Sequence, residues 1–412
     1  MKYITRNLLI IFLMAVAFSF LTGCENTITV DGIKYSLTNE FIDGEFCESY
    51  EVVGLKDTKL TNIIIPKFID GRIVTSIRYK AFENTNIAKV ELPDSIISIG
   101  SSAFMNCSNL NSIKFLDGLE MISGSAFSGC TSLEKVDLPD SVIEVDNYVF
   151  EKCTSLKYIK TPNNKECIFS EYALSGCTNL EELEISFFVF DDYEDCGQYG
   201  LKNIKYNHAQ LSYSKLPVKK VTISEGCEII PNCAFWNWGK IQTVIIPDTV
   251  KEIGSKAFCN CNSLNTITLP SSVEYIGYNA FELCISLKSI TINGVAEILD
   301  ETFNNCSSLE SVYLSSNLKT IGRRVFNGCG NLKEIIMPSK VKKIGEQCFT
   351  LSGLSRVFFM GTFSEWLMIN IDSDNYTVEH SAVYFYSYTK PSKDLIMYWH
   401  FVDGKPKRWS ES

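Results

Sequence analysis

The sequence has 412 residues, of which 45% are hydrophobic and 21% charged, and its formal net charge at pH 7 is −10. This composition is ordinary for a folded protein and excludes a disordered chain. Because the chain is acidic and has no block of Lys or Arg, it repels phosphate backbones, so we expect no nucleic-acid partner.

The first 23 residues have the build of a secretory signal peptide. Lys2 and Arg6 form a short positive region, and residues 8–20 are almost uninterruptedly apolar, which is fewer than the roughly 20 residues of a membrane-spanning helix. Residues 21–24, Leu-Thr-Gly-Cys, resemble the bacterial lipobox. That resemblance implies cleavage before Cys24 and acylation of its thiol and its new amino group.

A lipid anchor at Cys24 places the protein outside the cytoplasm, exposed at the bacterial surface and touching the membrane only through its acyl chains. Loss of Lys2 and Arg6 takes the net charge from −10 to −12. The alternative is an ordinary signal peptide whose cleavage site happens to contain a cysteine. Residues 24–55 carry strand-like apolar residues such as Ile33, Tyr35 and Leu37, and we expect them to form the anchor segment and an amino-terminal cap.

Residues 56–360 are a tandem repeat of 22–24-residue units. Fourteen units begin at Leu60, Ile87, Leu110, Leu133, Leu156, Leu180, Leu201, Val218, Ile241, Leu264, Leu287, Leu309, Leu332 and Leu354. Each starts with L-x-x-I-x-L, whose alternation predicts a short strand with one buried face, often ended by a proline. A glycine corner and an Ala-Phe pair follow, and we expect a short helical turn at that pair. Stacked units then bury one continuous core beside a ladder of parallel strands.

This cassette resembles the BspA-type class of bacterial leucine-rich repeats over about residues 55–360. The resemblance implies an α/β repeat fold, namely a leucine-rich-repeat solenoid with capped ends. It also implies a cell-surface protein, since members of that class are mostly surface proteins, some implicated in adhesion to host matrix proteins or to other bacteria.

The repeat is irregular at about residues 184–220, where no Ala-Phe pair occurs. Strand signatures persist there at Leu201–Tyr206 and Val218–Ile223, but the spacing shortens and an acidic, aromatic stretch lies between residues 187 and 199. Two interpretations stay open: a degenerate join between two repeat blocks, or a protruding loop pair that shapes a ligand site.

Eight of the sixteen cysteines stand three residues after the Ala-Phe position and form one column. They are Cys107, Cys130, Cys153, Cys177, Cys261, Cys284, Cys306 and Cys329. We expect buried reduced thiols, because a small apolar side chain with a weak donor suits a repeated corner. Disulfides between neighbouring coils are the alternative, and a linear column does not give the tetrahedral geometry of a metal site.

Residues 361–412 break the period and are rich in aromatic residues, which indicates a carboxy-terminal cap. The competing interpretation is a sugar-stacking module that uses residues such as Trp399 and Trp409. Catalytic motifs are lacking: the three histidines His208, His380 and His400 lie near no nucleophile motif, and no phosphate-binding loop follows a strand. We therefore expect no enzyme, no cofactor and no metal.

The residues that flank the buried middle of each strand face outward and form the candidate binding face. Charge concentrates in the first half and Thr in the second, with apolar anchors towards the end. The candidate ligand-binding residues are Tyr158, Lys160, Glu182, Glu184, Lys205, Lys220, Tyr313 and Phe358. A broad mixed surface suits a macromolecule better than a small molecule, which needs a deep pocket.

Three functions follow from these features. The leading one is a surface lipoprotein that binds a macromolecular partner, by adhesion or protein–protein recognition, with a protein or glycan on host or neighbouring cells as that partner. The second is a glycan-binding surface lipoprotein. The third, which no motif supports, is an envelope hydrolase.

Overall fold

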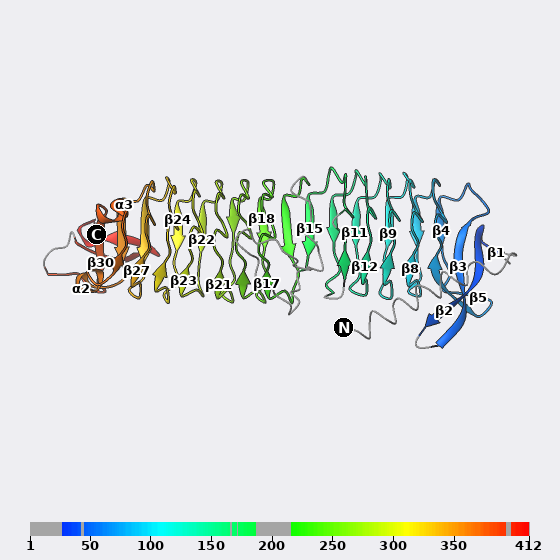
Figure 1. Ribbon diagram of the computed structural model, residues 1–412, viewed down its shortest axis with the longest axis horizontal. Helices are drawn as coiled ribbons and strands as arrows, with labels where there is room; N and C mark the ends of the chain where they lie inside the picture. Colours follow the sequence, from blue (N-terminus) through cyan, green and yellow to red (C-terminus); the bar gives the residue numbers. More distant parts are fainter. Residues whose placement is uncertain are drawn as a thin grey trace.

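The computed structural model describes residues 27–42, 45–164, 167–170, 172–186, 216–392 and 397–411. They form an elongated solenoid whose coils stack from the amino-terminal cap to the carboxy-terminal cap (Figure 1). Cys24 lies outside the described residues. Within them no helix is long and apolar enough to cross a membrane.

One long side of the solenoid, here called the strand face, carries the L-x-x-I-x-L strands. In the described part of the chain these number thirteen: β4 (Asn62–Ile64), β7 (Lys89–Glu91), β9 (Ser112–Lys114), β11 (Lys135–Asp137), β13 (Tyr158–Lys160), β15 (Glu182–Ile185), β16 (Lys220–Ile223), β18 (Thr243–Ile245), β20 (Thr266–Ile267), β22 (Ser289–Thr291), β24 (Ser311–Tyr313), β26 (Glu334–Met337) and β28 (Arg356–Phe359). Neighbouring strands run parallel, as where Lys135 pairs with Tyr158 and Tyr158 with Glu182. A parallel ladder of leucine-rich-repeat coils is therefore confirmed.

The opposite side of each coil carries a two-residue strand. These strands are β8 (Ser98–Ile99), β10 (Met121–Ile122), β12 (Glu144–Val145), β14 (Ile168–Phe169), β17 (Ile229–Ile230), β19 (Glu252–Ile253), β21 (Tyr275–Ile276), β23 (Glu297–Ile298), β25 (Thr320–Ile321), β27 (Lys343–Ile344) and β29 (Asn370–Ile371). They also pair in parallel. The glycine that follows several of them permits close stacking, because a Cβ at Gly277 would lie 2.4 Å from the backbone nitrogen of Ser255.

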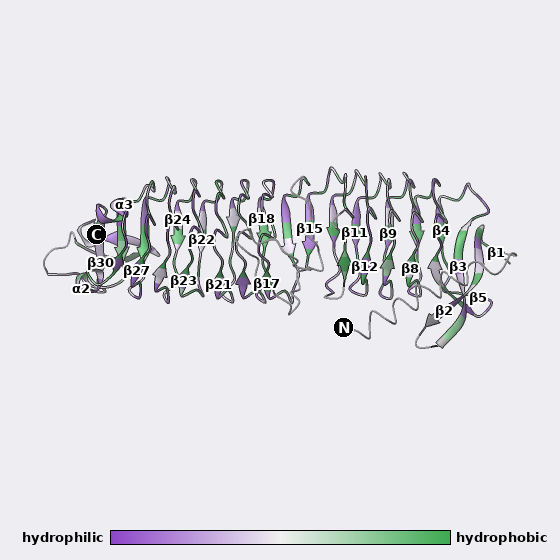
Figure 2. Ribbon diagram, viewed as in Figure 1, coloured by the Kyte–Doolittle hydropathy of each residue, from purple (hydrophilic) through white to green (hydrophobic). Residues whose placement is uncertain are grey.

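The core lies between the two ladders and contains a column of phenylalanine rings, one from most coils. Successive rings stack with centroids 5.1–5.8 Å apart from Phe82 to Phe150 and from Phe235 to Phe349. Figure 2 shows hydrophobic stretches recurring along the strands of the whole solenoid, with hydrophilic stretches between them. No coil can bury its apolar side alone, so the core is shared by neighbours throughout.

The α/β class is not confirmed, because the described residues are almost all strands and turns. Their α-helices are α2 (Phe363–Trp366) and α3 (Tyr376–Glu379), both in the carboxy-terminal region. The helical turn expected at each Ala-Phe pair is a tight corner instead. At one such corner Lys256 and Asn260 have φ values of 57° and 62°, and residues in this left-handed conformation interrupt a right-handed helix.

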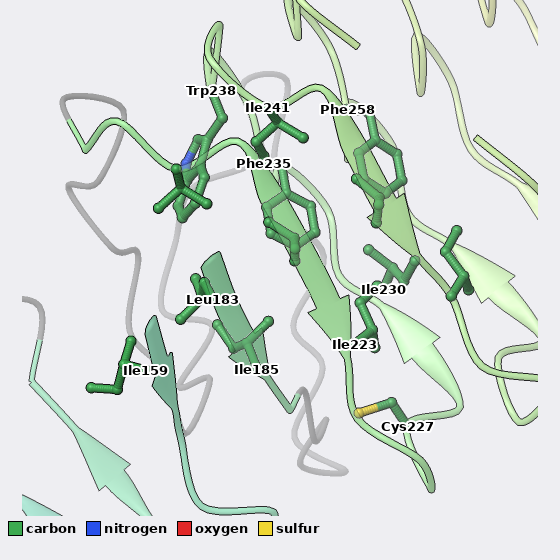
Figure 3. Packing of buried hydrophobic residues seen from close by; sticks show 14 of the residues in the cluster. Ile159, Leu183, Ile185, Ile223, Cys227, Ile230, Phe235, Trp238, Ile241 and Phe258 are labelled. Carbon is green, nitrogen blue, oxygen red and sulfur yellow. The ribbon is translucent and has the colours of Figure 1, made fainter. Parts of the chain in front are cut away.

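The irregular middle does not interrupt the strand ladder. β15 pairs directly with β16, with Glu182 opposite Lys220. No strand from the unit expected at Leu201 lies between them, and residues 187–215 are outside the described ranges. Figure 3 shows Leu183 and Ile185 of β15 and Ile223 of β16 turned towards one core, so the apolar interior passes through this join.

Antiparallel strands close the amino-terminal end. β1 (Thr27–Val30), β2 (Ile33–Ile42) and β3 (Glu45–Leu55) form a meander, and β3 continues in parallel to β6 (Arg72–Ile77), which pairs with β5 (Phe68–Ile69). Tyr35 and Val52 are fully buried there. These strands cover the first coil, whose core would otherwise meet solvent.

At the other end the strand face continues past β28. β30 (Ala382–Tyr386) pairs with β28, and β31 (Tyr398–Val402) and β32 (Lys405–Arg408) form an antiparallel hairpin, followed by the 3₁₀ turn η3 (Trp409–Glu411). The edge strand β32 carries two lysines and a proline, which discourage pairing with another chain.

Candidate binding surface

The strand face has two outward columns, formed by the first and third residue of each strand around a buried middle residue. In the first half, the third-position column alternates in sign from coil to coil: Glu91, Lys114, Asp137, Lys160 and Glu184. Glu91 and Asp137 pair with Lys89 and Lys135 of their own strands, so the cross-strand alternation keeps the net charge of this column small without pairing Lys114 or Lys160. Figure 2 colours the strands beside the β15 label largely hydrophilic.

Two of the candidate residues, Tyr158 on β13 and Glu184 on β15, contact each other, and Lys135 on β11 joins them. The Tyr158 hydroxyl donates to the Glu184 carboxylate at 2.9 Å, and the Lys135 ammonium lies 4.9 Å from the centre of the Tyr158 ring. Burial, and then the hydrogen bond to Glu184, raise the pKa of Tyr158 well above its ordinary value. Tyr158 therefore stays a neutral hydrogen-bond donor at physiological pH.

Glu182 and Lys220 also contact each other directly, with 2.9 Å between carboxylate oxygen and ammonium nitrogen. Beside them Lys219 and Glu181 form a second ion pair at 2.6 Å. Lys205 was expected on a strand between those of Glu182 and Lys220. That placement is wrong, because the two strands are adjacent, and Lys205 itself lies outside the described residues.

A shallow depression of about 610 Å³ lies on the strand face along β9, β11 and β13. Its lining includes Lys114 and Lys160, neither of which has an ion-pair partner among the described residues, and Lys135, which lies 3.8 Å from Asp137. Asp117 and Asp140 line its rim where the strands turn. The depression thus combines accessible positive charge on the strands with negative charge at the margin.

Phe115 lies in the lining of this depression. It occupies a buried position that Leu92 and Leu138 hold in the neighbouring coils, and its ring meets Phe127 edge-on at 5.6 Å. The larger side chain coincides with a break in the ladder, since β7 pairs with β9 and β11 pairs with β13, but β9 and β11 belong to different sheets. Phe115 departs from the leucine of the neighbouring repeats in the sequence, but that departure alone does not predict a depression.

The second half of the face is uncharged. Between Lys220 and Glu334 the two outward columns contain only Thr222, Thr243, Ile245, Thr266, Thr268, Ser289, Thr291, Ser311 and Tyr313. Tyr313 is 53% exposed, as expected for an anchor. Charged side chains border this surface only at the strand margins, as at Lys288 and Glu310.

Phe358 was expected to be exposed, and that is wrong: it is 3% exposed. Its ring stacks on Tyr384 with centroids 5.4 Å apart and meets Trp399 edge-on at 5.4 Å. The reason lies in the tail, because β30 extends the face and the hairpin of β31 and β32 packs over it. Of the apolar anchors expected near this end, Tyr313 stays exposed and Phe358 belongs to the cap.

The tail tryptophans have structural contacts. Trp399 is fully buried, and its indole nitrogen donates to the Phe359 carbonyl at 3.1 Å. Trp409 stacks on His400 at 3.7 Å. Since a buried ring offers no open face, Trp399 cannot stack on a sugar.

The cysteine column is a ladder of thiol hydrogen bonds. Each of its eight Sγ atoms donates to the carbonyl of a column phenylalanine in the preceding coil, at 3.0–3.3 Å. Burial raises the pKa of the Cys177 and Cys329 thiols to about 12. All eight cysteines of the column are free thiols.

No group of three or more His, Cys, Asp or Glu side chains in the described ranges could hold a metal ion. The two described histidines have local contacts: the His380 ring nitrogen lies 2.8 Å from the Tyr376 carbonyl, and His400 stacks on Trp409. Within the described residues the strand face, with its broad outward columns, remains the surface suited to a partner.

The fold and this surface define a solenoid protein of stacked leucine-rich-repeat coils. The chain belongs to the BspA-type leucine-rich-repeat family. The family model described as a BspA type leucine rich repeat region matches residues 75–196 and 228–355, which is more than half of the chain. Repeat proteins of this family and fold are typically non-enzymatic.

Several solved structures are similar. A leucine-rich repeat protein from Bacteroides ovatus is 21% identical, with 87% of this chain and 99% of that chain covered and a TM-score of 0.42. A leucine rich cell surface protein from Faecalibacterium prausnitzii is 23% identical, with 85% and 99% covered and a TM-score of 0.32. The pneumococcal vaccine antigen PcpA is 18% identical, with 89% and 95% covered and a TM-score of 0.36. No curated protein matches the sequence.

Proposed function

We propose that this protein is a bacterial surface lipoprotein that binds a protein partner through the charged half of its strand face. The observation that carries the proposal is the depression on β9, β11 and β13. It presents the ammonium groups of Lys114 and Lys160, which have no ion-pair partner among the described residues, beside the acidic rim of Asp117 and Asp140.

Such a surface fits a protein better than a small molecule. The depression is open and shallow, whereas a small ligand needs a pocket that buries most of its surface. Charges of both signs in fixed positions favour a partner of complementary pattern, because electrostatic complementarity selects partners and speeds association. Membership of the BspA-type family is compatible with adhesion or protein binding.

A binding assay with charge-reversed variants tests the proposal. The full chain, immobilised in detergent, is exposed to host matrix proteins and to bacterial surface extracts, and the affinity of each captured protein is then measured. The double variant Lys114→Glu with Lys160→Glu should weaken binding by about tenfold or more at low salt, and less at high salt. Lys319→Glu is the matched control, since Lys319 is exposed on the opposite side of its coil.

Equal affinity of the double variant and the control variant would show that the depression is not the site. If the unaltered chain captures no protein from any extract, the proposal of a protein partner is wrong. Circular dichroism and thermal unfolding of each variant exclude a folding defect as the cause.

The lipid anchor at Cys24 is the second part of the proposal and rests on Leu21-Thr22-Gly23-Cys24. When the full chain is expressed in a bacterial host, it should be found in the membrane fraction. Mass spectrometry of its amino-terminal peptide should give the mass of an acylated cysteine. Cys24→Ser should release the chain from that fraction, because its acyl chains would be lost. Membrane association that survives this substitution would contradict the anchor.

A further inference from the structure

The uncharged half of the strand face, from β16 to β24, has a chemistry of its own. We call it the hydroxyl face and define it by Thr222, Thr243, Thr266, Thr268, Ser289, Thr291 and Ser311, with Tyr313 at its end. A run of nine outward positions without charge differs sharply from the first half of the same face, where charged residues fill most outward positions.

The seven hydroxyl groups of this surface have no side-chain hydrogen bond to another described residue. Some serines and threonines elsewhere in the coils have such a bond, and it is structural. Ser95, Ser141, Thr249 and Ser272 each donate to a backbone carbonyl of the preceding coil at 2.7–2.8 Å. The hydroxyl face therefore offers donors and acceptors that the fold does not use.

The backbone arranges these hydroxyls as a grid. Thr243 pairs with Thr266 across the ladder, and Thr291 pairs with Tyr313. β20 and β22 also lie next to each other, joined by a hydrogen bond from the Lys288 amide to the Asn265 carbonyl at 3.4 Å. Parallel strands fix the spacing at about 4.8 Å between coils and about 6.6 Å along a strand. Neighbouring hydroxyls thus point the same way over five coils or more.

Tyr313 adds an aromatic surface at the end of this grid. Its ring is 53% exposed and lies beside Ile336 on the next strand, which packs against the buried Phe358 cluster. Ile245, 46% exposed, provides a second apolar site within the grid. Rows of hydroxyl groups beside an exposed aromatic ring match the two surfaces of a pyranose, its polar rim and its apolar C–H face.

We propose that the hydroxyl face binds a neutral polysaccharide chain lying across β18, β20, β22 and β24. An anionic glycan is disfavoured, because none of the outward positions between Lys220 and Glu334 carries a cation. A protein partner is disfavoured because the surface lacks the cluster of buried aromatic and arginine anchors that dominates protein interfaces. The site is separate from the depression on β9, β11 and β13 and does not depend on the proposed protein binding.

Affinity electrophoresis of the full chain tests this site. The probes are the neutral polymers mixed-linkage β-glucan, galactomannan and amylopectin, with polygalacturonate as the anionic comparator. At least one neutral polymer should retard the chain, and Tyr313→Ala should weaken that binding by about tenfold, the loss expected of a central aromatic contact. The triple variant Thr266→Val, Thr268→Val and Thr291→Val removes three hydroxyls at nearly constant side-chain volume and should weaken it similarly.

Two controls separate the possible outcomes. Tyr278→Ala removes a tyrosine of similar exposure, 49%, from a corner away from the strand face, and it should leave retardation unchanged. Lys114→Glu with Lys160→Glu should also leave it unchanged, so a failure of this site is distinguishable from a failure of the protein-binding proposal.

No retardation by any neutral polymer, or retardation that the Tyr313 and Thr variants leave intact, would overturn the proposal. Stronger retardation by polygalacturonate would overturn it too, since that result requires cations. Loss of matrix-protein binding in the Thr variants, without any effect on polysaccharide, would assign the surface to a protein instead.

Discussion

The buried corner of each coil and the outward strand face are made by the same repeat, yet they differ in how they vary. At the corner the same residues return coil after coil: a stacked phenylalanine and, in eight coils, a thiol bonded to the preceding phenylalanine carbonyl. On the strand face the charged, hydroxyl and aromatic stretches follow one another within thirteen described strands.

The difference has a physical origin. A corner residue contacts the equivalent residues of the two adjacent coils. A substitution there disturbs the packing with both coils and lowers the stability of the fold. An outward residue contacts mainly solvent and one side chain on each adjacent strand, so its identity is free to vary. The repeated corner residues therefore stabilise the fold, and the variable outward residues are the ones that we propose for recognition.

The largest expected effect is at the corner. Phe258→Ala removes a ring that stacks on Phe235 and Phe281 at 5.3 and 5.2 Å. It should lower the free energy of unfolding in urea by about 3–5 kcal/mol, because the cavity cannot close between two rigid neighbours. Leu351→Ala, at a side chain 78% exposed, is the control and should change little. Similar losses in the two variants would break the contrast between corner and surface.

The thiol ladder should contribute less than the ring column. Cys284→Ala leaves the Phe258 carbonyl without its thiol donor, which now lies at 3.2 Å, and should cost about 1–3 kcal/mol in urea unfolding. Cys284→Ser keeps a donor at that position and should lose less. If Cys284→Ser is less stable than Cys284→Ala, the thiol stabilises the corner through its apolar character and not through its hydrogen bond.

Alkaline pH should weaken the corner gradually. Burial raises the pKa of Cys329 and Cys177 to about 12 in the folded chain, against about 8.5 for an unfolded cysteine. A raised pKa means that this stability is fully present below about pH 8.5 and is lost as the pH rises towards 12. The urea midpoint should fall over that window, and less steeply in Cys329→Ala than in Cys47→Ala. Equal slopes would exclude the thiols as the cause.

The smallest effect on stability is expected at the strand face. Tyr313→Ala and Thr266→Val should each change the free energy of unfolding by about 0.5 kcal/mol or less, because both side chains are exposed. Urea unfolding measures this directly. A loss near that of Phe258→Ala would mean that the outward face is part of the stabilising structure and not a surface free for recognition.

Local pattern predicted most of the strand positions and the thiol column. The alternation in Leu264–Leu269 places Ile267 inside, at 5% exposure, and Thr266 and Thr268 outside. It did not predict the conformation of the corner, because alanine favours a helix and the left-handed residues around the Ala-Phe pair are ordinary amino acids such as Lys256 and Asn260. There the tight stacking of coils prevails over propensity.

The candidate site could be predicted only in part. Tyr158, Lys160, Glu182, Glu184, Lys220 and Tyr313 lie on the strand face, with Tyr158 and Glu184 bonded to each other. The prediction that Phe358 is exposed was wrong, because the hairpin that covers it comes from residues some forty positions later in the chain, as the contact with Trp399 shows. Lys205 was expected between Glu182 and Lys220, but β15 pairs directly with β16, and Lys205 lies outside the described residues.

The sequence by itself determined the repeat, its period, the buried and outward positions and the cysteine column, since these depend on contacts between equivalent residues of adjacent coils. Only the tertiary structure decided three features. It joined β15 to β16 across the irregular middle, left a depression along β9, β11 and β13, and folded the tail over Phe358. Each of these three features arises from a contact that occurs once and is not repeated in other coils, so the periodic pattern of the sequence could not predict it.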